Sequence, residues 1–488
     1  MPFKPYLLWT DVLVFVLVAA IGLFGWYVSR HEHLRVPWRK VGRSTPGMCA
    51  LVVLVVFVAI GLLDSLHFRP RLDNQPTSAK PNYAAEVRSV FDELVPALRT
   101  RPERTYSAPL ATHAFAKETV IRPDGSQVRE YPRLRFGGAH LQDPATQQFG
   151  DVVRRVLAGV GWGAVWWIVL SMLLAAGLAA RHNDDFGKVL SQIIRGRTEV
   201  PWRAMLFTAG ALLVIAGSLV TLSGSYHVLG TDKVGQDILY QTLKSIRTGL
   251  VIGTLTTLVM LPFALLLGIM AGYFRGWIDD VIQYVYTTLN SIPSVLLIAA
   301  AVLLMQVWID SRPELFETVS ERADLRLLFL CIILGVTSWT GLCRLLRGEA
   351  LKLREADYVQ AARAFGVSDW RIITRHLVPN VMHIVLITVV MEFSALVLAE
   401  AVLSYIGVGV DPTMISFGTM INNARLELAR EPMVWWSLAS AFVFMFILVL
   451  CANLFADAVR DAFDPRLRVG WTLPVLFKRR AAIEPRAS

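Results

Sequence analysis

The sequence is poor in charged side chains and in cysteine. Of its 488 residues, 18% are charged and 55% are hydrophobic, and the mean hydropathy is +0.50. So small a charged fraction excludes an ordinary soluble protein and places the chain in the membrane class. The four cysteines lie inside apolar runs without CxxC or His/Cys spacing, so we interpret them as packing residues and predict neither a disulfide framework nor a metal site. They are Cys49, Cys331, Cys343 and Cys451.

Motifs that carry chemistry are also lacking. The chain contains no G-x-x-x-x-G-K-[ST] phosphate loop, so it cannot supply an ATP site. His376 and His383 have no acidic partner at triad or metal spacing, and no HExxH motif occurs, so no catalytic residue is predicted. We detect none of the inverted repeats expected of a secondary carrier. The net charge of +10 comes without a basic recognition motif, so no nucleic-acid partner is expected.

Long hydrophobic runs are plentiful. A bilayer core of about 30 Å requires roughly 20 apolar residues per helix. Nine runs satisfy this rule, at residues 11–28, 48–66, 156–180, 204–223, 248–272, 283–308, 326–346, 383–406 and 434–458. Lys4 precedes the first run as it would in a signal peptide. Because Phe24, Trp26 and Tyr27 occupy the place of small cleavage-site residues, we expect an uncleaved anchor.

Lysine and arginine in the short loops predict the orientation. They concentrate in residues 29–47, in 181–203, between the spans 326–346 and 383–406, and after residue 458. The positive-inside rule assigns all four segments to the cytoplasm, which leaves the N-terminus outside and the C-terminus inside. If the first run does not span, only the N-terminus changes side.

The long loop at 67–155 then falls outside the membrane. It contains one stretch with a helical pattern, Ala84–Leu98, and a turn signal at Pro123-Asp124-Gly125. We interpret it as a small extracytoplasmic insertion, with partial disorder as the alternative.

A polar, helix-patterned segment, Glu349–Asn380, lies between two of the predicted cytoplasmic span ends. Residues from Glu349 to Phe365 predict a first helix, closed by Gly366 in the left-handed conformation. Ser368 is expected to cap a second helix, which Pro379 ends or returns to the membrane. An apolar set at near-helical spacing supports the first helix. Small residues at the bend would let another protein approach the backbone closely. The apolar set is Leu351, Tyr358, Ala361, Ala362 and Phe365, and the small residues are Ala361, Ala362 and Gly366. An ordinary amphipathic surface loop is the alternative.

Two acidic features accompany this segment. In Gly230–Leu239, GTDKVGQDIL, the acids Asp232 and Asp237 predict a turn and a helix cap, with a cation site as the alternative.

Glu392 and Glu400 lie within one span, about 80° apart around a helix. Because a carboxylate inside the bilayer is costly, they are expected to line a pathway or a subunit interface, or in the case of Glu400 to pack between helices.

The run YVQAARAFGVSDWRIITRHLVPN resembles the EAA loop of ABC importer permeases of the dipeptide and oligopeptide family. The resemblance is carried by Tyr358, Ala361, Ala362, Gly366, His376, Pro379 and Asn380. Gln360 replaces the glutamate of the motif and Val378 replaces a leucine, so the usual charge is lost at residue 360. GTDKVGQDIL resembles the family's GTDxxGRD signature, with Gln236 in place of arginine. GYFRGWIDD, SIPSVLL, EAVLSYIGVGVDP and AVRDAFDPRLR follow in the family's order, so the resemblance covers about residues 226–468.

This resemblance implies an all-α polytopic protein with a six-helix, type I ABC importer permease core at 226–468. About three N-terminal transmembrane helices, the 67–155 insertion and a cytoplasmic tail at 469–488 would be additions. The additional membrane segments would be 1–66 and 156–225. The family's first helix corresponds either to 48–66 or to 204–223.

The same resemblance implies the second permease subunit of a bacterial inner-membrane importer. Its partners would be a homologous permease, two cytoplasmic ATPases and an extracytoplasmic substrate-binding protein, with no cofactor. The cargo would be a peptide, or nickel, an opine, glutathione or a peptide antibiotic. The ATPase would dock on Tyr358, Gln360, Ala361, Ala362, Gly366, Ser368, His376 and Pro379. The outer signature would be Gly230, Thr231, Asp232, Gly235 and Asp237. A membrane enzyme or an ATP-independent secondary carrier is the alternative function.

Overall fold

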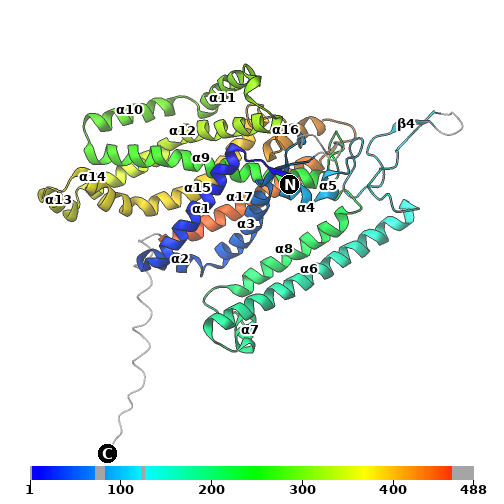
Figure 1. Ribbon diagram of the computed structural model, residues 1–488, viewed down its shortest axis with the longest axis horizontal. Coiled ribbons are helices and arrows are strands. Elements are labelled where there is room, and N and C mark those ends of the chain that lie inside the picture. Colours follow the sequence, from blue (N-terminus) through cyan, green and yellow to red (C-terminus); the bar gives the residue numbers. More distant parts are fainter. Residues whose placement is uncertain (1–2, 72–82, 122–126, 464–488) are drawn as a thin grey trace, which may run out of the picture.

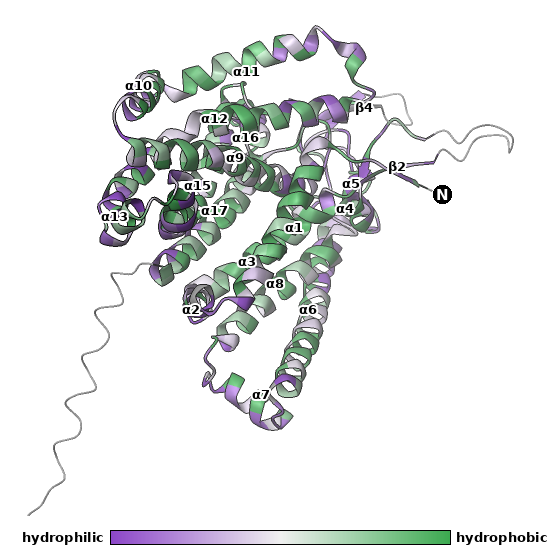
Figure 2. Cartoon of the chain, turned by 60° about the vertical axis from the view of Figure 1, so that its left-hand side comes forward, coloured by the Kyte–Doolittle hydropathy of each residue, from purple (hydrophilic) through white to green (hydrophobic). Residues whose placement is uncertain are grey.

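Helices long enough to cross a membrane dominate the computed structural model, which describes residues 3–71, 83–121 and 127–463 (Figure 1). Within those residues, eight helices have the length and hydropathy of a membrane span. Each predicted run lies on one of them or on one additional bent pair. The long helices are α1 (Trp9–Arg30), α3 (Thr45–Asp64), α6 (Pro144–His182), α8 (Trp202–Ser223), α9 (Ile238–Phe274), α12 (Val319–Arg354), α15 (Val378–Tyr405) and α17 (Trp436–Phe463). Figure 2 shows hydrophobic residues along these helices and hydrophilic ones at their ends.

The span predicted at 283–308 is not one continuous helix. Two helices, α10 (Trp277–Ser291) and α11 (Ser294–Asp310), meet there at 88°. Pro293 has no backbone N–H to continue a helix, and the residue before a proline is restricted to extended conformations. Ile292 accordingly adopts φ −92° and ψ 131°. The proline therefore separates the run into two helices that point in different directions.

The core forms around α9 and α12, which pack along their length with α3, α15 and α17 around them. Small residues permit the close approach of these helices. A Cβ added at Gly268 would lie 2.8 Å from the Cys343 carbonyl oxygen, and one at Gly272 would lie 2.6 Å from the Arg347 carbonyl oxygen. Such spacing matches the small-residue interfaces of membrane helices. The core is thus assembled by backbone proximity as well as by apolar side chains.

A separate helical hairpin lies beside this core. Its long arms, α6 and α8, pack against each other and are joined at one end by the short helix α7 (Phe186–Ile194) (Figure 1). A Cβ added at Gly159 would lie 2.5 Å from the Ser218 Cα, and one at Gly163 would lie 2.6 Å from the Leu213 carbonyl oxygen. The hairpin packs on the core chiefly through α8 against α3.

The insertion between α3 and α6 is partly β-sheet. Strands β1 (Phe3–Pro5), β2 (His67–Pro70) and β3 (Arg88–Ser89) form one antiparallel sheet, and β4 (Glu118–Ile121) pairs with β5 (Gln127–Glu130). The single helix predicted at Ala84–Leu98 is wrong, because β3 precedes two short helices, α4 (Val90–Leu94) and α5 (Pro96–Arg99). Pro96 starts the second of these, since it cannot continue the first. The turn predicted at Pro123-Asp124-Gly125 lies outside the described residues.

Buried ion pairs fix the N-terminal elements to α9. The Arg247 guanidinium lies 2.5 Å from the carboxylate of Asp11 on α1. One turn earlier, the Lys244 ammonium lies 3.2 Å from Asp64 on α3 and 2.8 Å from Asp92 on α4. Removing one partner of such a buried pair leaves an uncompensated charge and costs roughly 3–5 kcal/mol. The first helix is therefore held to the core by charge and packing together.

The remaining described helices are short connections. They are α2 (Glu32–Val41), the 3-10 turn Pro313–Leu315, α13 (Asp357–Ala364), α14 (Asp369–Ile372), the π-helical turn Ile373–Leu377 and α16 (Phe417–Glu427). Helices α13 and α14 lie at one end of the bundle, and the segment with β4 lies at the other (Figure 1).

Candidate functional site

The polar segment 349–380 forms two short helices at the end of α12. The prediction of one helix from Glu349 to Phe365 is wrong, because α12 ends at Arg354 and α13 begins at Asp357. Ala356 between them is extended, with φ −69° and ψ 139°. The break allows α13 to leave the axis of α12 and to bury Val359, of which 2% is exposed, in the core.

Aromatic side chains project from this hairpin into solvent. Tyr358 is 45% exposed, Trp370 is 70% exposed and Phe365 is 87% exposed. Two residues of the predicted apolar set, Tyr358 and Phe365, are therefore exposed, whereas Val359 packs inward. Exposed apolar side chains in an otherwise polar segment mark a surface that another protein can bind. Trp370 was not singled out from the sequence, although a tryptophan in a polar loop is itself a signal of such a surface.

The turn between α13 and α14 depends on Gly366. Its φ of +73° is the left-handed conformation that closes a helix, as the sequence predicts. A Cβ added there would meet no atom within 4 Å, so the space above the turn is open. Ser368 occupies the N-cap position of α14, but its hydroxyl accepts no capping hydrogen bond. Of the two alternatives predicted for Pro379, the second agrees with the structure, because Pro379 lies in the first turn of the long apolar helix α15 and does not end a helix.

The other predicted coupling residues lie on the same segment and differ in exposure. Gln360 and Ala361 are exposed, whereas Ala362 and His376 are half-buried. The Gln360 amide donates to Glu355, 3.3 Å from its carboxylate, so it is held on the hairpin's own surface. A hollow of about 380 Å³ opens beside it, lined by Tyr273, Arg354, Glu355, Val359, Gln360, Arg363 and Ala364. The segment thus carries a hollow and three exposed aromatic side chains.

Two polar contacts connect the hairpin to the membrane helices. The Tyr273 hydroxyl at the end of α9 donates to Asp369, 2.6 Å away on α14. Arg275 pairs with Glu355 at 2.7 Å. A displacement of α13 and α14 would therefore pull on α9 directly, as well as on α12, which continues into the hairpin.

The outer signature forms a compact turn before α9. Asp237 caps α9 by accepting from the backbone N–H groups of Leu239, at 2.8 Å, and Tyr240. The Asp232 carboxylate accepts from the Gln236 backbone at 2.8 Å. Both acids are thereby engaged in backbone bonds, which agrees with a turn and a cap. In the described ranges, no group of three or more His, Cys, Asp and Glu residues could hold a metal ion.

The two glycines of the signature adopt positive φ and touch the insertion. Gly230 has φ +78° and Gly235 has φ +77°. A Cβ at Gly235 would lie 1.9 Å from the Glu103 carbonyl oxygen, and one at Gly230 would lie 2.5 Å from that of Ser107. The Thr231 hydroxyl donates to the Thr105 carbonyl at 2.9 Å. The signature residues therefore pack directly against residues 103–107 of the insertion.

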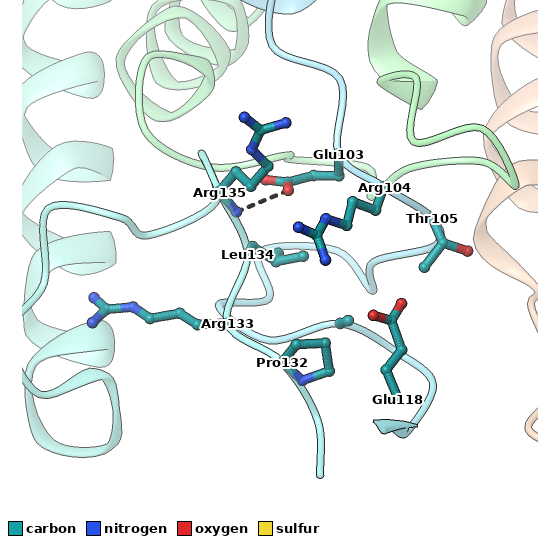
Figure 3. Close-up of a pocket in the computed structure, with 9 residues that line it drawn as sticks. Glu103, Arg104, Thr105, Glu118, Pro132, Arg133, Leu134 and Arg135 are labelled. Atoms are coloured by element: carbon teal, nitrogen blue, oxygen red, sulfur yellow. Dashed lines mark hydrogen bonds between the residues drawn. The ribbon is translucent and has the colours of Figure 1, made fainter. Parts of the chain in front are cut away.

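A buried histidine bridges these two segments. The His227 imidazole lies 2.8 Å from Asp237 and 3.4 Å from Glu103. Burial alone would lower the pKa of His227, but the two carboxylates raise it to about 9. Burial alone would raise the pKa of Glu103, but His227 and backbone N–H groups lower it to about 2. Figure 3 shows Glu103 accepting from the Arg135 backbone, beside a hollow of about 150 Å³.

The two intramembrane glutamates occupy different environments. Glu400 is 1% exposed and accepts from the hydroxyls of Ser404, at 2.7 Å, and Ser416, at 2.9 Å. It ties α15 to the N-cap of α16, which is a packing role. Glu392 is half-buried, and in the described part of the chain its carboxylate has no hydrogen-bond or ion-pair partner. Of the two, only Glu392 is free to face a water-filled path.

Comparison with known proteins identifies the family. Residues 264–469 match the family described as binding-protein-dependent transport system inner membrane component. The oligopeptide transport system permease protein OppC of Mycobacterium bovis is 35% identical over 242 residues, which are 50% of this chain and 77% of that protein. The glutathione transport system permease protein GsiD of Pectobacterium atrosepticum is 32% identical over 246 residues, 50% of this chain and 74% of that one.

Further similarity extends to more distant proteins. The dipeptide transport system permease protein DppC of Lactococcus lactis is 31% identical over 49% of this chain and 64% of its own length. A solved structure of the MetNI methionine ABC transporter, described as inward facing, aligns with 46% of this chain and 98% of that chain. Its identity is 14% and the TM-score is 0.36.

Proposed function

The chain belongs to the binding-protein-dependent transport system inner membrane components, and from that premise we propose that it forms half of the translocation pathway of an ATP-driven importer of peptides or similar small solutes. As a member of this family it is a membrane permease subunit of an ABC transporter, and the family is one of transporter permeases and not of enzymes. The observation that carries the proposal is the hairpin formed by α13 and α14. Its exposed aromatic side chains lie on the same short helices as the EAA-like residues.

Two features support separate ATPase subunits as partners. The chain has no phosphate-binding loop of its own. The surface around Tyr358, Gln360, Ala361, Gly366 and Trp370 is exposed and partly apolar, as a docking surface must be. We assign ATP hydrolysis to two such subunits and the other half of the pathway to a second, homologous permease. An extracytoplasmic binding protein would deliver the cargo.

The proposed mechanism is alternating access. Closure of the ATPases on ATP would bring the two hairpins together, and the contacts of α13 and α14 with α9 and α12 would tilt those helices. A rigid-body transition of this kind requires a ligand that binds one state better than the other, which ATP supplies through the ATPases. Glu392 is proposed to line the pathway or the subunit interface, and Glu400 to brace α15 against α16.

The proposed orientation keeps the hairpin and the C-terminus in the cytoplasm of a bacterial inner membrane. The basic segments 29–47, 181–203 and 347–375 support it. The outer signature and the insertion, with boundaries near 67 and 155, then face the binding protein. Helix α6 begins at Pro144, so its first turns belong to that insertion.

We further propose that α3 corresponds to the family's first helix and that α6, α7 and α8 are inserted after it. Helix α3 packs against both α9 and α17 of the permease domain, whereas α6 packs on α7 and α8. The permease domain proper would be 226–468 with α3, and residues 469–488, which lie outside the described residues, a cytoplasmic tail.

The identity of the cargo is tested by transport in proteoliposomes that contain the chain, the second, homologous permease and the ATPases. We expect ATP-dependent uptake of a labelled oligopeptide that requires the binding protein. Uptake of nickel or glutathione in its place, with no peptide uptake, would reassign the cargo and leave the permease function intact.

A further inference from the structure

An apolar groove lies on the α6–α8 hairpin, beside the start of α3. Its volume is about 790 Å³, within the range of roughly 300–1,000 Å³ typical of small-molecule sites. Most of its lining comes from α6, α7 and α8, and Thr45 at the start of α3 closes it on the core side. The apolar lining includes Trp167, Met172, Leu190, Ile194 and Phe207.

The packing of helices α6, α7 and α8 explains why the groove exists. In their outer halves α6 and α8 are in backbone contact, at Gly159 and Gly217, and the Trp167 ring covers Gly210. Beyond Trp167, helix α7 inserts Val189 and Ile193 against Ala175 and Ala179 of α6. The two arms therefore diverge at this end, and no side chain of the described residues fills the space toward α3.

Positive charge borders this groove. Arg203 is part of its lining and is exposed, and within the described residues no carboxylate lies within ion-pair distance of it. Its side chain lies against the turn at Gly196, where a Cβ would be 3.8 Å from the Arg203 Cδ. Arg195 and Arg197 flank that glycine and are exposed too. The nearby carboxylate of Glu199 is already paired with Arg43 at 3.1 Å.

The position of the groove matches the head-group level of a bilayer. Helix α7 is amphipathic: Val189 and Ile193 are buried, and Lys188 is exposed. Short helices of this kind lie in the membrane interface with their apolar face inward. Trp202, at the start of α8, is a residue type enriched at that level. An apolar groove here opens toward acyl chains, and its basic rim opens toward phosphates.

We propose that this groove binds one anionic glycerophospholipid, with an acyl chain along Trp167, Met172 and Phe207 and the phosphate at Arg203. In the proposed orientation the groove lies in the cytoplasmic leaflet, where anionic lipids attract basic segments. The bound lipid would fill the space between the hairpin and α3. It would thus join the added helices to the permease domain without using the coupling hairpin.

Lipid retention and rebinding test this inference. The transporter is purified in mild detergent, its retained lipids are identified by native mass spectrometry, and the delipidated protein is titrated with phosphatidylglycerol or phosphatidylcholine. We expect phosphatidylglycerol to be retained and to bind more tightly than phosphatidylcholine. Arg203→Gln should weaken phosphatidylglycerol binding by about fivefold, the effect of one basic residue near a lipid surface. Arg344→Gln removes an exposed charge from α12 and is the matched control.

A second pair of variants tests the groove itself. Ala204→Trp fills the lining and should abolish retention of the lipid. Ala211→Trp adds the same bulk to the same face of α8 two turns away, and should not. Equal binding of the two lipids, or an Arg203→Gln variant that behaves like Arg344→Gln, would overturn the proposal. So would a cross-link from a cysteine at residue 204 to a partner protein, because a protein segment would then occupy the groove. Since Arg203 is exposed, its variant tests lipid binding even if Ala204→Trp does not fold.

Discussion

The Arg347 guanidinium makes two hydrogen bonds to the Asp279 carboxylate, at 2.6 and 2.7 Å. Arg347 lies on α12, seven residues before that helix ends at the coupling hairpin, and Asp279 lies in the first turn of α10. Paired, planar contacts of this type fix orientation as well as distance. The contact therefore connects the helix that carries the hairpin to the first half of the bent pair α10–α11.

Loss of this contact should uncouple transport from ATP hydrolysis. Hydrogen bonds to charged groups contribute about 1.5–3 kcal/mol. We therefore expect Asp279→Asn to lower ATP-driven uptake about tenfold or more while the ATPases remain bound, as measured by uptake and pull-down on one preparation. Asp310→Asn removes one of the two carboxylate partners of Arg326, which lies toward the opposite end of α12 and keeps Asp411 at 2.7 Å, and is the control. Equal loss in both variants would mean that general stability, and not coupling, was affected.

The exposed aromatic side chains should contribute to docking and not to folding. Phe365 and Trp370 are 87% and 70% exposed, so replacing both by alanine should change the melting temperature little. An aromatic anchor of an interface contributes roughly 2 kcal/mol or more, which is about 30-fold in affinity, so loss of both should weaken ATPase binding by several hundredfold. Leu304, 74% exposed on α11, supplies a control alanine variant. A pull-down at several ATPase concentrations measures the effect, and unchanged binding in the double variant would be incompatible with this docking surface.

Gly366 should be required for its backbone conformation. A side chain at φ +73° costs about 1–2 kcal/mol, although the open space means that no clash is added. Gly366→Val is therefore expected to lower the thermal stability of the hairpin, and Gly366→Asn to lower it less, because asparagine tolerates this conformation. Hydrogen exchange of the peptide that covers 357–372 reports the local effect. Equal protection in the two variants would contradict the assignment.

Gly235 should hold the insertion in place. A Cβ would lie 1.9 Å from the Glu103 carbonyl oxygen, so Gly235→Ala must displace residues near 103. Gly276→Ala is a close match, since Gly276 also has positive φ, +60°, but has no atom within 4 Å of a built Cβ. We expect limited proteolysis to cleave the insertion faster in the first variant only. The same cleavage in both would show that backbone strain, and not the contact, is responsible.

The contact of His227 with Glu103 and Asp237 should make stability depend on pH. The folded-state pKa of His227 is about 9, above its ordinary value of 6.5, so its contribution is complete below pH 6.5 and is lost as pH rises through about 9. For Glu103, the pKa is lowered from 4.5 to about 2, so its contribution is complete above pH 4.5 and is lost as pH falls through about 2. The free energy of unfolding should therefore be greatest between about pH 4.5 and pH 6.5, where both contributions are complete.

His227→Gln tests this pH dependence. It should remove up to about 3 kcal/mol at pH 6 and should flatten the decline between pH 7 and 9. Thermal unfolding across pH 5–10, together with hydrogen exchange at 103–107, gives the measurement. His383→Gln, a substitution near the start of α15 and far from these contacts in the sequence, should leave the profile unchanged. A variant at residue 227 that kept the wild-type slope would exclude the histidine as its cause.

The membrane helices were predictable because each exceeds the bilayer thickness with apolar residues, and that signal is local. The bend at Pro293 was missed because hydropathy does not register direction, although the proline itself was visible. The break at Ala356 depends on burial of Val359 in the core, which no local pattern contains. Likewise, Phe365 fits an apolar helical stripe in sequence and is exposed in three dimensions.

Long-range contacts were the least accessible part of the fold. The turn at Asp232 and the cap at Asp237 follow from local chemistry. That Gly235 touches Glu103, more than a hundred residues earlier, does not, because the close approach of two loops leaves only glycine at one of them. The same holds for Arg247 and Lys244, whose partners come from three N-terminal elements and from Asp324 on α12.

The most direct test of the central claim is to purify the tagged chain with its co-expressed partners, as wild type and as the Phe365→Ala/Trp370→Ala variant, and to measure bound ATPase and ATP-dependent uptake in proteoliposomes. We expect stoichiometric ATPase and uptake with the wild type, and loss of both with a variant that is still folded and inserted. Uptake by the isolated chain without ATPase, or full assembly and uptake by the double variant, would contradict a permease that is driven through this hairpin.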